Sequence, residues 1–454
     1  MTRNRRSISR RRFVQAGTVA ATLGIAGCSG NGDGDGGDGG DGGDGGDGGD
    51  GSDGSDGGDG GSTPAGPVEV VHGWTGGDGQ AAGQNLLEAF EGAYDGTEVD
   101  WNPVGGGANT NLNAVVANRL QNNDPPGVFA NWPGKWMTRY EGVLGNVDDV
   151  WEEEGFEDAH VQEAQDLHTQ NGAYRGVPVG SHRLNCLFYN VSVVEEAGVD
   201  PDSLNSISAF IDALDTVSTE TDKVPFTHLM SGPWATVQLF GEMYLGEHGY
   251  DAYMSFIDGS PDRDSVVSTF ENMQTILENY ISDDASSIDL TASNSNIISG
   301  DAAFIHQGNW AAGAFRNADD FEYDEDWGFK TFPGTEGMYS LHFDSFLYPS
   351  DNPTPEASKN WLRFVGSEEG QIAFNTLKGS IPTRTDVDMS EFGPYLQETQ
   401  QDFADAEERP PNLYHGLGVF DETQSALEEV VSSEFSGPYD PEAAADGFVD
   451  AVSN

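Results

Sequence analysis

The sequence predicts an α/β protein of two lobes that are joined by three crossings of the chain. Residues 67–454 number 388, which is more than a typical single domain and enough for two cores. Their first segments follow the order β-α-β-α-β, which indicates a parallel sheet covered by helices. We expect the three crossings at the extended runs Gly180–Arg183 and Trp327–Gly334 and in the segment after Arg384.

The first lobe is expected over about residues 67–180 and 335–385. Its strands are apolar and β-branched or alternate in polarity, and its helices repeat apolar residues at intervals of three and four. The strands are expected at Val68–Gly73, Val99–Val104, Val128–Ala130 and Phe346–Pro349, and the helices at Gln80–Tyr94, Leu112–Leu120, Pro355–Val365 and Glu368–Leu377.

The second lobe is expected over about residues 184–330 and 390–454. One of its strands contains Cys186, which we interpret as a packed thiol because its neighbours are apolar. The strands are expected at Leu184–Tyr189, Phe226–Met230 and Ala302–His306, and the helices at Ser206–Val217, Ala235–Leu245, Val266–Ile281, Thr423–Val431 and Pro441–Val452.

The first 27 residues have the features of a signal peptide. Ser9–Phe13 contains three consecutive arginines in the manner of a twin-arginine export signal. Ala16–Gly27 is a short apolar run, below the roughly 20 residues that span a bilayer. Ile25–Cys28 resembles the lipobox of prokaryotic lipoproteins, so we expect lipidation at Cys28. A cleaved signal with an incidental cysteine is the alternative.

Residues 28–66 are dominated by Asp-Gly-Gly repeats. They offer almost no apolar side chains to bury, so we expect a disordered tether between the lipid anchor and the lobes. Calcium binding is the alternative, but the aliphatic position of a calcium-binding β-helix repeat is missing. We therefore interpret the aspartates as solvating groups.

The charge of the chain is strongly negative, at −57. Without the six arginines that precede Cys28, 14 basic residues face 77 acidic ones. Such a surface repels nucleic acid, so no nucleic-acid partner is expected. The acids are spread along the chain and lysine occurs only five times, a composition that resembles proteins of halophilic archaea.

Four segments together are similar to the sugar-binding subunits of ABC importers, and to the glucose-binding branch in particular. They occur in the family's order within Val68–Val452 and are Gly308–Gly313, Phe343–Phe346, Asn360–Ser367 and Leu377–Ile381. The resemblance implies a type II periplasmic-binding-protein fold with the ligand in the interlobe cleft. It implies a monomer without metal or cofactor that binds a glucose-like hexose and delivers it to a membrane permease. A disaccharide is the alternative ligand.

A sugar has apolar C–H faces and many hydroxyl groups, so its site needs aromatic platforms and fixed hydrogen-bonding groups. Asp344 lies between the apolar Phe343 and Phe346, where a carboxylate needs donors. Helix capping by Asp78, a hinge ion pair at His182 and a purely structural His415 stay open as alternatives. The expected ligand-binding residues are Trp74, Asp78, Trp132, His182, Trp234, Asn309, Trp310, Asp344, Lys378 and His415.

No enzymatic activity is expected. The chain has no Gly-x-Ser-x-Gly elbow, no His-Glu-x-x-His helix, no phosphate loop and no cysteine ligand pair. We therefore expect a binding protein that is held on the outer face of the cell membrane by its lipid. A secreted carbohydrate-active enzyme and a surface adhesion protein are the alternatives from other classes.

Overall fold

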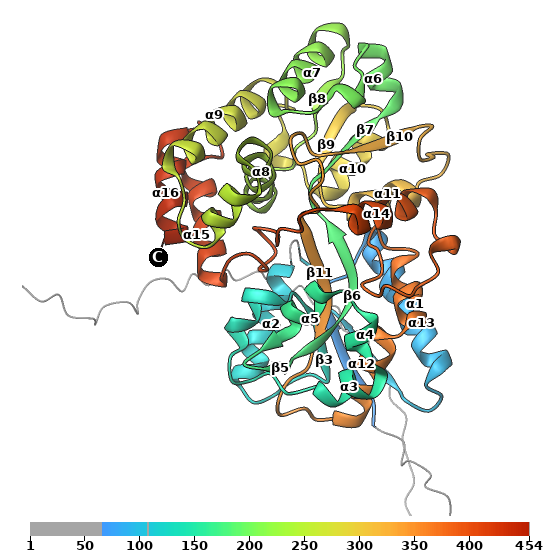
Figure 1. The fold of residues 1–454 in the computed structure, drawn as a ribbon. Helices are drawn as coiled ribbons and strands as arrows, with labels where there is room; N and C mark the ends of the chain where they lie inside the picture. Colours follow the sequence, from blue (N-terminus) through green and yellow to red (C-terminus); the bar gives the residue numbers. More distant parts are fainter. Residues whose placement is uncertain (1–65, 107–108, 454) are drawn as a thin grey trace, which may run out of the picture. The chain divides into compact units, whose positions relative to one another are not determined.

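The computed structural model describes residues 66–106 and 109–453, which form two α/β lobes, each built around its own sheet (Figure 1). This confirms the predicted fold class. The predicted signal peptide, Cys28 and the tether up to Ala65 lie outside the described residues. Within the described ranges, no helix has both the length and the hydropathy needed to cross a membrane.

The sheet of lobe 1 has the strand order β2-β1-β3-β11-β6. β1 is parallel to β2 and β3, as the β-α-β-α-β order predicts, and β11 is antiparallel to both β3 and β6. The strands are β1 (Val68–His72), β2 (Val99–Pro103), β3 (Val128–Asn131), β6 (Gly176–Arg183) and β11 (Leu341–Leu347).

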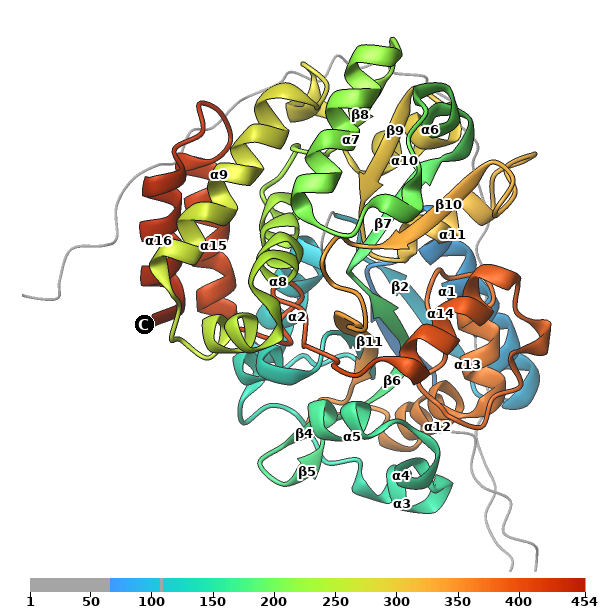
Figure 2. The same cartoon turned by 45° about the horizontal axis from the view of Figure 1, so that its top comes forward.

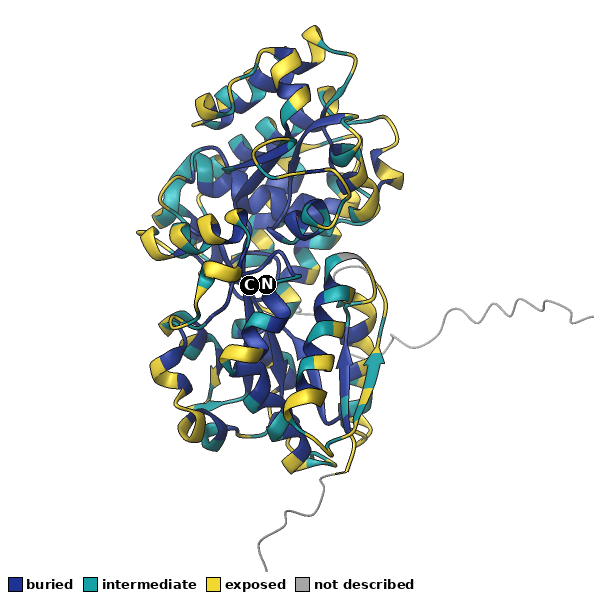
Figure 3. Cartoon of the chain, turned by 90° about the vertical axis from the view of Figure 1, so that its right-hand side faces the viewer, coloured by how far each residue is buried: buried dark blue, intermediate teal, exposed yellow. Residues whose placement is uncertain are grey.

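Successive residues of these strands face opposite sides of the sheet, and each side has its own core. Val70 belongs to the core under α1, α12 and α13, whereas Val71 belongs to the core under α2 and the 3-10 helix η2. These helices are α1 (Gly77–Ala93), α2 (Thr110–Gln121), η2 (Gly134–Tyr140), α12 (Pro355–Gly366) and α13 (Glu368–Asn375). Figure 3 shows the buried strands between helices whose outer faces are exposed.

Between η2 and β6 the chain forms short elements that the sequence does not predict. They are α3 (Asp148–Glu154), α4 (Phe156–Ala159), α5 (Gln162–His168), β4 (Thr169–Gln170) and β5 (Ala173–Tyr174). None is long enough to repeat a helical or strand pattern, and they depend on packing: Trp151 stacks on Tyr174 with the ring centroids 4.0 Å apart.

The sheet of lobe 2 has the order β10-β7-β9-β8. Leu187 faces one core of this lobe, and Cys186 and Phe188 face the other. Cys186 is a buried free thiol, as predicted, and burial raises its pKa to about 12. The strands are β7 (Cys186–Asn190), β8 (Val224–Phe226), β9 (Ala302–His306) and β10 (Trp327–Thr331).

Helices cover both faces of the second sheet. α9, α15 and α16 lie side by side at its periphery (Figures 1 and 2). The helices of this lobe are α6 (Val191–Ala197), α7 (Ile207–Glu220), α8 (Trp234–Ile257), α9 (Arg263–Asn279), α10 (Leu290–Ile298), α11 (Trp310–Arg316), α14 (Pro394–Asp405), α15 (Asp421–Glu434) and α16 (Pro441–Ser453).

The first two crossings lie a few residues beyond the predicted ones. Residues 180–183 are still part of β6, and the first crossing is Leu184–Asn185. Residues 327–331 form β10, so the second crossing is 332–340. The Asn185 side chain explains why the expected strand 184–189 starts late: it bonds to the second crossing, through Thr335 Oγ1 at 3.0 Å and the Ser340 amide at 3.1 Å.

After Arg384 the chain passes to α14, which packs on the second sheet through Tyr395 and Phe329. Residues 406–412 then return beside the second crossing, where the Leu341 amide donates to the Pro410 carbonyl at 2.8 Å. The first two crossings and this returning segment therefore meet at one hinge.

Trp361 tests the core of lobe 1. It is fully buried and packs against Phe90, Trp101 and Phe346. We expect Trp361→Ala to lower the free energy of unfolding by about 3–5 kcal/mol, because it leaves a large cavity. Phe420→Ala, at an exposed position, is the matched control and should change it by less than about 1 kcal/mol. Denaturant titration in molar salt measures both, and equal losses would contradict this assignment of the core.

Candidate ligand-binding cleft

A cavity of about 770 Å³ lies between the two lobes, within the roughly 300–1,000 Å³ typical of small-molecule sites. Nine of the ten residues predicted to bind ligand line it, although they come from segments far apart in the sequence. They are Trp74, Asp78, Trp132, His182, Trp234, Trp310, Asp344, Lys378 and His415. The structure thus brings the predicted residues together, and their contacts with a ligand stay a prediction.

The four tryptophans lie just after strands or at the first residue of a helix. Trp74 follows β1 and Trp132 follows β3, at the carboxyl ends of parallel strands, where ligands of α/β sheets bind. Trp234 and Trp310 are the first residues of α8 and α11. Both lobes therefore contribute aromatic faces to the cleft.

Asp344 lies at the floor of the cleft with its side chain 13% exposed. Its Oδ2 accepts a hydrogen bond from His182 Nε2 at 3.1 Å, and its Oδ1 lies 3.5 Å from His342 Nε2. Burial opposes ionisation, but the two imidazoles outweigh burial and hold the pKa of Asp344 well below its usual range. The cleft therefore presents a charged acceptor to hydroxyl groups.

His342 belongs to the cleft, although the sequence did not single it out. It pairs directly across the two strands with His182, and the rings are 5.7 Å apart. Burial lowers the pKa of His342 to about 4, so its ring is neutral near pH 7. Its position two residues before Asp344 on one strand was the available signal, because such residues share a face.

His415 completes an aromatic cluster at the cleft floor. Its ring lies 5.0 Å from Trp132, 5.2 Å from Trp310 and 4.5 Å from His342. Burial lowers the pKa of His415 well below its usual range, so this ring is also neutral near pH 7. Lobe 1, strand β11, helix α11 and the chain just after the returning segment all meet here.

Asn309 does not line the cavity, in contrast to the expectation from the sequence. It is fully buried behind His182, whose Nδ1 lies 2.6 Å from Asn309 Oδ1. The reason is local geometry, because Asn309 directly precedes α11, its side-chain oxygen lies against His182, and Gly379 packs directly on its carbonyl. His182 contacts both Asn309 and Asp344. It is therefore both a paired residue of the hinge and a residue that lines the cleft, the two alternatives that the sequence leaves open.

Asp78 and Lys378 form an ion pair at the edge of the cleft. Lys378 Nζ donates to Asp78 Oδ2 at 2.8 Å, with the side chains 7% and 15% exposed. Helix α1 begins after Gly76, and the Asp78 carboxylate is engaged by the lysine instead of capping the helix. Asp78 also packs against Gly313 of α11, where a Cβ would approach it to 2.6 Å. The two lobes are therefore in close contact at this edge.

The outer part of the cleft contains residues that the sequence did not single out. Tyr414 lies 6.3 Å from Trp234, and its hydroxyl donates to Glu428 of α15. Burial and the Glu428 carboxylate raise the pKa of Tyr414. Asp289 lines the same part of the cleft. Only tertiary structure joins these residues, so no sequence signal reveals them.

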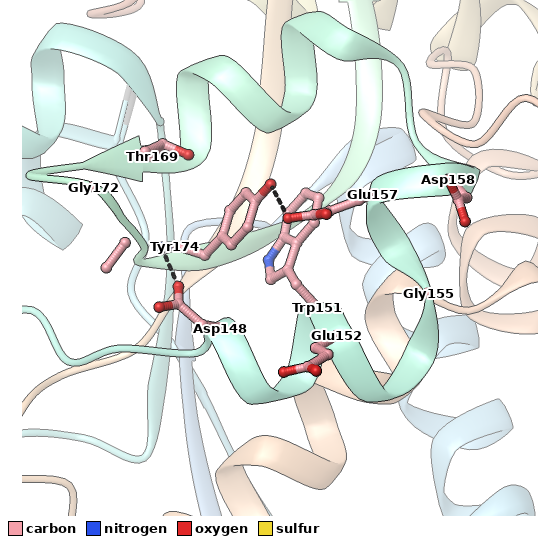
Figure 4. A pocket seen from close by; sticks show the side chains of 10 residues that line it. Asp148, Trp151, Glu152, Gly155, Glu157, Asp158, Thr169, Gly172 and Tyr174 are labelled. Carbon is pink, nitrogen blue, oxygen red and sulfur yellow. Dashed lines mark hydrogen bonds between the residues drawn. The ribbon is translucent and has the colours of Figure 1, made fainter.

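A second hollow, of about 650 Å³, lies on lobe 1 among α3, α4 and β5 (Figure 4). Its aromatic residues, Trp151 and Tyr174, are stacked face to face, so they leave little free ring surface for a ligand. Two of its acids are engaged by the protein, since Asp148 accepts from the Tyr174 amide and Glu157 from the Tyr174 hydroxyl. The interlobe cleft is therefore the better candidate site.

Among the described residues, no three His, Cys, Asp or Glu side chains form a group able to hold a metal ion.

Comparisons with known proteins agree with this architecture. Residues 85–401 match the family described as bacterial extracellular solute-binding protein. The chain is 50% identical to the xylose/arabinose-binding protein XacG of Haloferax volcanii, over 98% of both chains. It is 29% identical to the ABC transporter extracellular-binding protein PH1214 of Pyrococcus horikoshii, over 85% of this chain and 87% of that one.

A solved structure shows the same fold at low sequence identity. The bacterial solute receptor AcbH superimposes with a TM-score of 0.75 at 18% identity, covering 86% of this chain and 98% of the receptor.

The Asp78–Lys378 pair can be tested without a ligand. We expect Asp78→Asn to lower the free energy of unfolding by about 1–3 kcal/mol, because a nearly buried ammonium loses its carboxylate while cleft water still reaches it. The double variant Asp78→Asn with Lys378→Met should lose less than Asp78→Asn alone. Denaturant unfolding of the three proteins measures this, and strictly additive losses would show that the two groups do not interact.

Proposed function

Because the chain belongs to the bacterial extracellular solute-binding protein family, we propose that it is the sugar-binding subunit of an ABC importer. It captures a monosaccharide between its two lobes and delivers it to a membrane permease. It works as a monomer on the outer face of the cell membrane, where the lipid predicted at Cys28 keeps it near the permease.

One observation carries the sugar assignment: four tryptophans from both lobes surround a cleft with an ionised carboxylate at its floor. Indole rings match the apolar C–H face of a sugar, and a carboxylate accepts hydrogen bonds from two hydroxyls at once. A ligand that lacked these hydroxyls would leave the Asp344 charge unpaired, which supports selectivity for polyhydroxylated ligands.

The choice among sugars rests on the relatives. XacG, at 50% identity, is named for xylose and arabinose, so we propose a pentose as the first candidate ligand. The glucose-like hexose expected from the sequence is the second candidate, and a disaccharide the third.

The mechanism is binding followed by closure of the lobes, with no bond made or broken. A ligand that contacts Trp132 and Asp344 on one side and Trp234 and Trp310 on the other favours the closed arrangement. Closure also fixes the relative positions of the outer surfaces of both lobes. A permease that contacts both lobes therefore distinguishes loaded from empty protein.

A thermal-shift screen in molar salt tests this function. We expect xylose or arabinose to raise the melting temperature at millimolar concentration, with glucose and disaccharides as comparison ligands. Mass analysis of the sugar after incubation distinguishes binding from catalysis. Recovery of intact sugar supports an importer subunit, converted sugar would indicate an enzyme, and no shift with any sugar would overturn the sugar assignment.

Site variants test the cleft itself. Trp310→Ala and Asp344→Ala should both abolish the thermal shift, because both side chains face the cavity. Without sugar, the melting temperature should stay nearly unchanged for Trp310→Ala and fall for Asp344→Ala, because the buried His182 loses its acceptor. Glu157→Gln, in the hollow on lobe 1, is the control and should keep the full shift. A large loss of stability in the sugar-free Trp310→Ala protein would assign this residue to the core instead.

A further inference from the structure

Glu242 is a carboxyl group in the interior of the protein, on α8 at the hinge. It is fully buried, and its Oε1 accepts from Ser340 Oγ at 2.6 Å and from Asn412 Nδ2 at 3.4 Å. Its Oε2 has no partner among the residues that the structure describes. Ionisable groups are rarely buried this deeply, because burial without full pairing is costly. An apolar side chain would fill this space at a lower cost, so packing alone does not explain a carboxyl group at position 242.

The two donors to Glu242 belong to two segments of the hinge. Ser340 ends the second crossing, and its amide donates to Asn185 of the first crossing at 3.1 Å. Asn412 lies in the returning segment, where its backbone amide donates to the Leu341 carbonyl at 2.9 Å. Glu242 therefore links α8 directly to two of these segments and, through Ser340, to a third.

Asn412 continues this chain of hydrogen bonds into the ligand cleft. Its Oδ1 accepts from the backbone amides of Tyr414 and His415, and it lies 3.0 Å from His415 Nδ1. An oxygen that faces two backbone N–H groups can only be an acceptor, so the neutral His415 ring must carry its proton on Nδ1. Its Nε2, which has no partner among the described residues, is then an acceptor available to the cleft.

We propose that Glu242 is a positioning residue for the sugar site: through Asn412 it holds His415 as a hydrogen-bond acceptor for a ligand hydroxyl. The side-chain amide of Asn412 is held at both ends, because its N–H donates to Glu242 and its oxygen accepts from His415. Without Glu242, the amide nitrogen of Asn412 loses its acceptor in the interior, and the side chain is free to turn. This inference rests on the proposed sugar-binding function.

The surroundings of Glu242 give the same site a response to pH. The ionisable groups near it are Arg183 at the end of β6, Cys186 in β7 and Tyr253 in α8. Burial raises the pKa of Glu242 to about 7, against the bonds from Ser340 and Asn412 and the charge of Arg183, which lower it. The folded protein thus binds this proton more tightly than the unfolded chain, in which the pKa of a glutamate is 4.5. The stability that Glu242 contributes therefore falls as the pH rises from about 4.5 through 7.

Glu247 provides a matched control on the same helix. Its carboxylate also accepts from one hydroxyl and one amide, Thr269 Oγ1 at 2.9 Å and Asn272 Nδ2 at 3.0 Å, and burial also raises its pKa. Both donors belong to α9, away from the cleft. A change at Glu247, whose side chain is 10% exposed, therefore reproduces the loss of a largely buried carboxylate without disturbing His415.

The test compares Glu242→Leu, Glu242→Gln, Glu247→Leu and wild-type full-length protein. Calorimetry measures Kd for the sugar found to bind, and nitrogen-15 NMR of the histidine rings reports the His415 tautomer without sugar. We expect Glu242→Leu to raise Kd at least tenfold and to mix the His415 tautomers. Glu242→Gln, which keeps an acceptor, should stay within threefold. Because it removes the titration of Glu242 alone, its melting temperature should rise relative to wild type as the pH is raised from 5 to 8. Glu247→Leu should melt earlier with unchanged Kd.

The inference is overturned if Glu242→Leu keeps Kd within twofold and leaves the Nδ1–H tautomer of His415 intact, or if Glu247→Leu raises Kd equally. If Glu242→Leu fails to fold, Asn412→Ala interrupts the same series of hydrogen bonds between Glu242 and His415, and it must give the same loss of affinity. If wild-type protein binds no sugar, the proposed function fails, while the His415 tautomer still tests the role of Glu242.

Discussion

The antiparallel pairing of β6 with β11 is the constraint on which both the lobes and the cleft depend. β6 leads into the first crossing and β11 follows the second, so this pair connects the hinge to the sheet of lobe 1. The same register places His342 opposite His182 and Asp344 opposite Gly180, with a β-bulge directly after Asp344. Bulges change the direction of side chains beside functional sites. The floor of the cleft and the hinge are therefore one piece of backbone.

Placing a carboxylate in this position has an energetic consequence. Burying Asp344 is unfavourable by itself, and His182 and His342 compensate for it with donors held by the strand pairing. His182 is in turn held by Asn309 at the start of α11. A contact between the lobes thus stabilises the group that is proposed to accept the sugar hydroxyls. In a protein that works by closure, this arrangement couples ligand binding to the relative position of the lobes.

Much of the fold could be predicted from the sequence because its signals are local. The β-α-β-α-β opening and the helices around Leu86 and Val266 follow from apolar periodicity, and the cleft tryptophans stand out because they follow strands or glycines. Signals of this kind do not distinguish residues that line a cavity from residues directly behind them, which is why the sequence predicts Asn309 in the cleft. Glu242 and Tyr414 gave no signal at all, since their partners lie far away in the chain. The strand expected at Leu184 starts later because the Asn185 side chain forms hydrogen bonds with the second crossing. Local strand propensity cannot predict a contact with a segment so far away in the sequence.

The central claim is that one sugar molecule lies between the lobes, against the tryptophans and with its hydroxyls on Asp344. A crystal structure of the protein grown with the sugar that stabilises it tests this most directly. The account predicts an intact sugar ring in contact with Trp310, with a hydroxyl group within hydrogen-bonding distance of Asp344 and a second one on His415 Nε2. A sugar seated in the hollow on lobe 1, or a cleft whose Asp344 makes no contact with the bound sugar, would contradict it.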